Sequence, residues 1–148
     1  MMLSWLFSDP LTVGAEAPDF AVPDDRGRTV TLAALRGRYV VLVFYPGDDT
    51  PGCTKQLCQF RDDWSQAKKR GVLVFGVNPQ DARHHANFRK KFKFPFPLLV
   101  DQGQEVAKAY HANGLFVKRT VYLIGRDGKI LFARRGMPSP AEVLAAAK

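Results

Sequence analysis

The two cysteines of this chain are the residues whose type and spacing point most directly to chemistry. Cys53 and Cys58 are the only cysteines among its 148 residues, and they lie five positions apart. Two cysteines are too few for a disulfide framework, and in a reducing compartment such a pair is more often catalytic or metal-binding than structural. The pair therefore predicts thiol chemistry.

Cys53 is expected in the first turn of a helix. It follows Thr50, a suitable N-cap, and Pro51, which suits the first helical position. A free thiol has a pKa near ~8.5, so only a few per cent of it is nucleophilic thiolate at neutral pH. The unpaired N–H groups and the dipole of a helix N-terminus favour an anion. A free cysteine can also be a small buried apolar residue, but this position favours a reactive one.

Cys58 falls in the same predicted helix. Five helical residues rise ~7.5 Å and rotate ~500°, which turns the two side chains ~140° apart, whereas a disulfide needs Cα atoms within ~7 Å and converging Cβ vectors. Cys53 and Cys58 therefore cannot bond while the helix is intact. Either they never pair, or the first turns unwind when they do, and local unfolding of a terminal turn is energetically modest.

The surrounding segments alternate between strands and helices. Residues 39–45 form a continuous apolar run, as expected of a central strand covered on both faces. After the cysteine segment, apolar residues follow the 3-4-3 spacing of one buried helical stripe, at Leu57, Phe60, Trp64 and Ala67. We expect strands at 21–22, 29–31, 39–45, 72–77, 96–100, 120–124 and 129–133, and helices at 51–70, 81–92, 103–111 and 140–147. This order predicts a mixed three-layer α/β domain with a central sheet flanked by helices.

Length and composition are those of one globular domain. Hydrophobic residues make up 46% and charged residues 24%, and no apolar run approaches the ~20 residues that span a bilayer. We expect an N-terminal tail at 1–11 and a single domain at 12–148. The apolar start of the chain has no basic n-region, so a tail is favoured over a signal peptide and the cytoplasm over export. The net charge of +8 permits nucleic-acid or acidic partners without requiring them.

Several motifs together resemble the peroxiredoxin family. Pro46-x3-Thr50-x2-Cys53 is similar to the peroxiredoxin active-site motif, and Cys53-x4-Cys58 resembles its PrxQ, or bacterioferritin comigratory protein, branch. Further matching stretches are Gly14-x-x-Ala17-Pro-Asp-Phe20, Phe60-Arg-Asp62, Phe94-Pro-Phe-Pro-Leu-Leu-Val-Asp101, and Arg119 ahead of Tyr122-Leu-Ile124. The resemblance covers roughly residues 12–148.

The resemblance implies a thioredoxin-like fold, and reduction of hydrogen peroxide and organic hydroperoxides. The turn residues at 23–28, between the strands expected at 21–22 and 29–31, predict an N-terminal β-hairpin extension to this fold. It implies that Cys53 attacks the peroxide and becomes a sulfenic acid, that Cys58 resolves it to an intramolecular disulfide, that Thr50 and Arg119 complete the site and that Pro46 shields it. A thioredoxin-like dithiol would restore both thiols. No cofactor or metal is implied, no membrane or nucleic-acid partner is expected, and a monomer is favoured.

Other interpretations of the same residues stay open at this level. Arg119 alone could be an ordinary strand-end arginine, and a shift of one residue in strand register would place its neighbour Lys118 at the site instead. His84, His85 and His111 invite a zinc site with the cysteines, but they lack ligand spacing, so solvated or core-bonded histidines are the default. As functions, a thiol–disulfide oxidoreductase would more typically carry Cys-x-x-Cys, and a basic module without peroxidase activity would show salt-sensitive binding of nucleic acid or an acidic partner.

Overall fold

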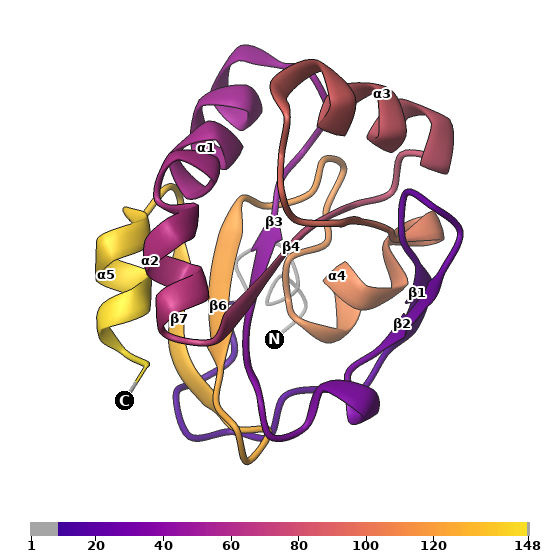
Figure 1. The fold of residues 1–148 in the computed structure, drawn as a ribbon. Helices are drawn as coiled ribbons and strands as arrows, with labels where there is room; N and C mark the ends of the chain where they lie inside the picture. The colour runs from indigo at the N-terminus through magenta and orange to yellow at the C-terminus, as the bar shows by residue number, and fades with distance from the viewer. Residues whose placement is uncertain (1–8, 148) are drawn as a thin grey trace.

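A five-stranded mixed sheet forms the centre of the molecule (Figure 1). The computed structural model describes residues 9–147. The sheet has the order β5-β4-β3-β6-β7, in which β3, β4 and β5 are parallel and β6 and β7 antiparallel to their neighbours. Its strands are β3 (Tyr39–Phe44), β4 (Val72–Asn78), β5 (Leu98–Val100), β6 (Thr120–Ile124) and β7 (Ile130–Arg135). The expected mixed α/β architecture is confirmed.

The helices lie where the sequence patterns place them, with one difference. They are α1 (Pro51–Asp62), α2 (Trp64–Lys69), α3 (Ala82–Phe92), α4 (Glu105–Ala109) and α5 (Pro140–Ala145), with single 3₁₀ turns at Ala33–Leu35 and Gln102–Gln104. The single helix predicted for 51–70 is wrong, because Asp63 leaves the helical region with ψ at 14° and divides it in two. The predicted apolar stripe still continues from α1 into α2, since Phe60 and Ala67 are both buried.

Both faces of the sheet are buried, as expected from the apolar run of β3. Every residue of that strand is buried. Alternate positions point to opposite cores, Val41 and Val43 into one and Val40 and Leu42 into the other. The first core also takes side chains of α1, α2, α3 and α5, and the second takes side chains of α4 and of the N-terminal segment. The fully covered β3 is therefore a rigid base for the loop that follows it.

The expected N-terminal hairpin is present as β1 (Ala21–Pro23) and β2 (Thr29–Thr31), paired antiparallel. Asp25, in the turn between them, is buried and ties the hairpin to the domain. Its carboxylate accepts hydrogen bonds from the Arg89 guanidinium on α3 at 3.1 Å and from the Leu98 N–H at the start of β5 at 3.1 Å. The hairpin thus docks beside α3 and the sheet edge.

The tail expected at 1–11 falls mainly on residues 1–8, which lie outside the described residues, and its boundary stays a prediction. Just after them, the Leu11 N–H donates to the Tyr122 hydroxyl at 2.9 Å. Within residues 9–147 no helix has the length and apolar character needed to cross a membrane.

Candidate active site

The pairing of β3 with β6 brings the two halves of the candidate site together. Phe44, at the end of β3, is opposite Thr120, at the start of β6, in an antiparallel register. The residues just beyond this pair therefore lie at the same edge of the sheet: the loop that leads from β3 into α1 on one side, and Arg119 on the other. Figure 1 shows α1 beginning above this end of β3.

Cys53 lies in the first turn of α1, as predicted. Thr50 is the N-cap residue, with extended backbone, and its carbonyl accepts the first helical hydrogen bond from the Thr54 N–H at 2.8 Å. The expected side-chain cap is absent at this N-cap, because the Thr50 hydroxyl donates to the Gly47 carbonyl at 3.0 Å instead. Pro46, half-buried, begins the loop that ends at Thr50.

The Arg119 guanidinium joins the cysteine to the rest of the site. One of its nitrogens, Nη2, donates to the Cys53 sulfur at 3.3 Å, and the other, Nη1, donates to Gln56 Oε1 at 2.8 Å. Cys53 is only 1% exposed and Gln56 is fully buried. The register therefore selects Arg119 for this contact, rather than its neighbour Lys118.

Gln56 is a site residue that the sequence patterns did not identify. It lies one turn after Cys53 on α1, and its amide nitrogen donates to the Gly136 carbonyl at 3.2 Å. The Gly136 N–H donates in turn to the Arg119 carbonyl at 2.8 Å. Gln56 thus connects α1 to the guanidinium of Arg119 directly and to its backbone carbonyl through Gly136. Its place on the same helical face as Cys53 is the only signal that the sequence offered.

Cys58 lies in the same unbroken helix and is half-buried against the core formed by α1 and the sheet. Both cysteines are free thiols. Burial raises the pKa of the Cys58 thiol, the nearby Asp62 adds to the rise, and Arg61 opposes it. Cys58 is thus kept in the thiol form, and the intact helix turns it away from Cys53 as its spacing predicts.

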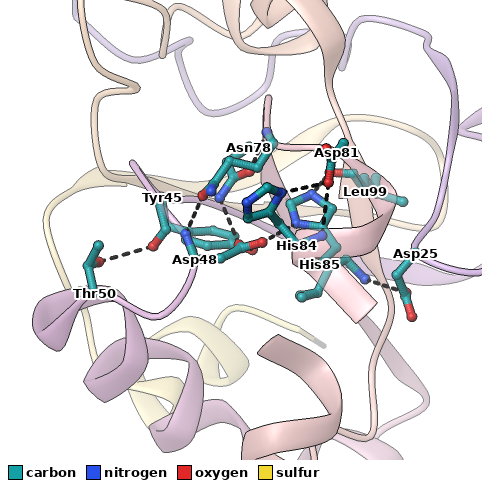
Figure 2. A network of polar contacts seen from close by, with 12 residues as sticks. Asp25, Tyr45, Asp48, Thr50, Asn78, Asp81, His84, His85 and Leu99 are labelled. Atoms are coloured by element: carbon teal, nitrogen blue, oxygen red, sulfur yellow. Dashed lines mark hydrogen bonds and ion pairs between the residues drawn. The ribbon is translucent and has the colours of Figure 1, made fainter. Parts of the chain in front are cut away.

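The contacts of Asp48 fix the loop that precedes α1 (Figure 2). One carboxylate oxygen accepts hydrogen bonds from the Tyr45 hydroxyl at 2.6 Å and the Asn78 amide at 3.0 Å, and the other lies 2.6 Å from Nδ1 of His85. The Asp48 N–H donates to the side chain of Gln80. The loop that carries Pro46 and Thr50 is therefore tied to β4 and α3.

The three histidines are explained by ordinary hydrogen bonds. His85 is buried and bonded at both ring nitrogens, His84 pairs with Asp81 on the surface, and His111 contacts the Asp9 carbonyl. No three His, Cys, Asp or Glu side chains within residues 9–147 are grouped so that they could hold a metal ion.

Comparison with known proteins identifies the family of this chain. The AhpC/TSA family profile matches residues 13–133 of the 148. The chain belongs to the AhpC/TSA family. Relatives within this family include peroxiredoxin Q, chloroplastic, of Oryza sativa subsp. japonica, 42% identical over 123 residues that cover 80% of this chain and 57% of the rice protein. The chain thus spans little more than half the length of that relative.

Two further members match along most of their length. A protein of Coxiella burnetii named peroxiredoxin bcp is 41% identical over 129 residues, which cover 81% of this chain and 85% of that protein. The crystal structure of peroxidoxin BcpB from Mycobacterium tuberculosis superposes on this chain with a TM-score of 0.87, covering 93% of this chain and 96% of that one. The two sequences are 32% identical. The resemblance to the PrxQ branch and the thioredoxin-like fold are both confirmed. This peroxiredoxin membership does not favour the basic-module or thiol–disulfide alternatives.

The contacts of Gln56 predict a measurable effect on this member of the family. Gln56→Ala should lower the free energy of unfolding by about 1–3 kcal/mol, because it leaves a half-buried guanidinium N–H and the Gly136 carbonyl without their partner. Gln56→Glu should lower the free energy of unfolding by less, since a carboxylate still accepts a hydrogen bond from Arg119. Urea unfolding measures both, with Gln59→Ala on the same helix as the matched control. Equal stability of Gln56→Ala and Gln59→Ala would contradict the structural role of Gln56.

Proposed function

We propose that this chain is a thiol-dependent peroxidase that reduces hydrogen peroxide and organic hydroperoxides. The contact between the Arg119 guanidinium and the Cys53 sulfur, 3.3 Å long at a helix N-terminus, carries the proposal. A cation and a helix dipole both stabilise negative charge on sulfur. Membership of the AhpC/TSA family supports the same chemistry.

In the first step the Cys53 thiolate attacks one peroxide oxygen. The S–O bond forms, the O–O bond breaks, and the other oxygen leaves with the electron pair, taking a proton to become water or an alcohol. Cys53 is oxidised to a sulfenic acid as the peroxide is reduced. Arg119 is placed to hold the peroxide and to stabilise the charge that grows on the leaving oxygen.

Thr50 and Pro46 complete the peroxide site in this proposal. The Thr50 hydroxyl proton is directed to the Gly47 carbonyl, so its oxygen keeps lone pairs that can accept a hydrogen bond from the peroxide O–H. Thr50 is exposed and Pro46 half-buried, which suits a substrate that enters from solvent and a proline that shields the sulfur from water. Together these groups align the peroxide with the attacking sulfur.

In the second step Cys58 resolves the sulfenic acid. Its thiol condenses with the oxidised Cys53, an S–S bond forms and water leaves. Since the two side chains lie ~140° apart around α1, the first turns of α1 have to unwind before the sulfurs meet. Unwinding also removes the burial that raises the Cys58 pKa, so the resolving thiol becomes more acidic when it is needed.

We further propose that an external dithiol of the thioredoxin type reduces the disulfide and closes the cycle, which makes the enzyme an atypical 2-Cys peroxidase. A dithiol exchanges with the Cys53–Cys58 disulfide and leaves as a disulfide itself, so electrons balance without a cofactor. A cytoplasmic location and a monomeric state remain predictions from the sequence.

A thiol titration tests the assignment of the two cysteines. With stoichiometric hydrogen peroxide, the wild type should lose both free thiols to one intramolecular disulfide, counted by alkylation and mass spectrometry. Cys58→Ser should stop at an oxidised Cys53, and Cys53→Ser should barely react because Cys58 is held as a thiol. Peroxide consumption by Cys53→Ser at the wild-type rate would rule out the proposed function.

Arg119→Ala should slow oxidation of Cys53 by about 100- to 1,000-fold, the usual effect of removing a preorganised donor to developing charge. Arg119→Lys should be intermediate, because it keeps a charge but cannot reach both Cys53 and Gln56. Lys118→Ala, one position away, is the matched control. Stopped-flow oxidation rates measure all three, and a larger effect at Lys118 would move the role to that residue.

Disulfide formation should also be visible as a loss of helix. Peroxide treatment of the wild type should raise amide hydrogen exchange across residues 51–58, because these turns of α1 no longer form hydrogen bonds. Cys58→Ser, oxidised in the same way, should keep the protection of the reduced protein. Protection that persists in the disulfide form would contradict the unwinding step.

A further inference from the structure

A buried acid–base pair, Asp48 with His85, adjoins the loop that leads into α1, and neither step of the proposed peroxide reduction uses it. The Asp48 side chain is 3% exposed and that of His85 fully buried, and their nearest atoms are 2.6 Å apart (Figure 2). Burying two ionisable groups is unfavourable unless each is paired and hydrogen-bonded. Asp48 and His85 therefore need further hydrogen-bond partners besides each other.

The hydrogen bonds define where the protons lie. His85 Nε2 is 2.8 Å from the Leu99 carbonyl, which can only accept, so this nitrogen carries a proton. Asp48 Oδ1 already accepts from the Tyr45 hydroxyl and from Asn78, as expected of a carboxylate. Between Asp48 Oδ2 and His85 Nδ1 we place the proton on the ring, because an imidazole is a stronger base than a carboxylate, which makes His85 a cation.

The electrostatics agree with this assignment. Burial lowers the pKa of His85, but the hydrogen bond and charge of Asp48, with the Leu99 carbonyl, outweigh it and leave the pKa raised above the ordinary imidazole value. Burial first, and then the charge of Asp48, raise the pKa of Tyr45 well above its usual range, so its hydroxyl remains a donor. A second acid–base pair, Asp25 with Arg89 at 3.1 Å, lies on the hairpin and α3.

Asp48 lies two residues before the N-cap Thr50 and five before Cys53, in the loop that leads into α1. We propose that His85, as an imidazolium ion, is a positioning residue for peroxide reduction: it holds the Asp48 carboxylate, and through it the loop of residues 46–50 that presents Thr50 and Cys53 to substrate. This inference rests on the proposed peroxidase function.

His85 contacts this loop at Asp48. The next residue, Asp49, has a left-handed backbone with φ at 57°, which is uncommon outside glycine, and its side chain makes an exposed ion pair with Lys91, which contributes little stability. The turns that unwind for the disulfide lie beyond this point. The His85–Asp48 pair should therefore support attack on peroxide and have little influence on the later condensation with Cys58.

His85→Gln tests this separation of steps. A glutamine cannot reach both Asp48 and the Leu99 carbonyl, so the loop loses a fixed point. Oxidation of Cys53, measured in a Cys58→Ser background, should slow by about 10- to 100-fold, the effect of a small displacement of reacting groups. Disulfide formation from the sulfenic acid, measured with Cys58 present, should keep its rate. His84→Gln, the same change at the exposed neighbour, should alter neither step.

Asp48→Asn supplies a second variant in which folding is less at risk. Asparagine still accepts from Tyr45 and Asn78 and can donate to Nδ1 of a neutral His85, so the hydrogen bonds persist without the charges. Nitrogen NMR of histidine-labelled protein should show two protonated ring nitrogens for His85 in the wild type and one in this variant. The oxidation rate should fall, by less than in His85→Gln.

The pair also predicts how stability depends on pH. Because the pKa of His85 is raised in the folded state, its contribution is fully present below the ordinary imidazole pKa and is lost as pH rises through the folded value. The free energy of unfolding of the wild type should fall across that window. The fall should be absent in His85→Gln and retained in His84→Gln, which removes the other histidine of α3.

Three results would overturn the proposal: wild-type oxidation rates in His85→Gln, equal slowing of both steps, or a neutral His85 ring in the wild type. If His85→Gln does not fold, an unchanged oxidation rate in Asp48→Asn with a neutral ring would do so as well. Failure of the peroxidase function itself looks different, because wild type and Cys53→Ser would then consume peroxide equally.

Discussion

The antiparallel register between β3 and β6 is the constraint on which the site depends. Phe44 opposite Thr120 places Arg119 beside the loop that leaves β3, where its guanidinium reaches the Cys53 sulfur. A shift of one residue would turn each β6 side chain to the opposite face of the sheet. The register is held because β6 is buried on both faces and carries apolar side chains into two cores.

This dependence explains which parts of the site could be predicted from the sequence. The cysteine spacing, the N-terminal turn of α1 and the buried strand before it follow from local patterns, and all lie within about one turn or strand of each other. Only the family resemblance predicts a role for Arg119, because its place beside Cys53 results from the pairing of β3 with β6, which brings together residues 75 positions apart in sequence (44 and 119). Local periodicity carries no information on that pairing.

Gln56, Asp48 and His85 show a second limit. Each is a polar residue buried by tertiary contacts, and in the sequence each resembles an ordinary surface residue. His85 was expected to be either solvated or bonded in the core, and the core interpretation is the correct one. The break at Asp63 was missed for a related reason, since the apolar stripe continues across it and only the backbone departs.

The proposed cycle makes opposite demands on α1, and the distribution of contacts reconciles them. The reduced site needs an intact first turn, because Cys53 meets Arg119 only there, whereas the disulfide needs that turn to open. Unwinding exposes Leu57, which is fully buried, at about 1.5–3 kcal/mol, and it separates Gln56 from Arg119 at about 1.5–3 kcal/mol more. A local opening of this size is small enough to occur and large enough to favour the closed helix while both cysteines are reduced. Because opening also removes Arg119 from Cys53, the oxidised protein no longer presents the peroxide site, and a reductant would meet a different surface from the one that the substrate meets.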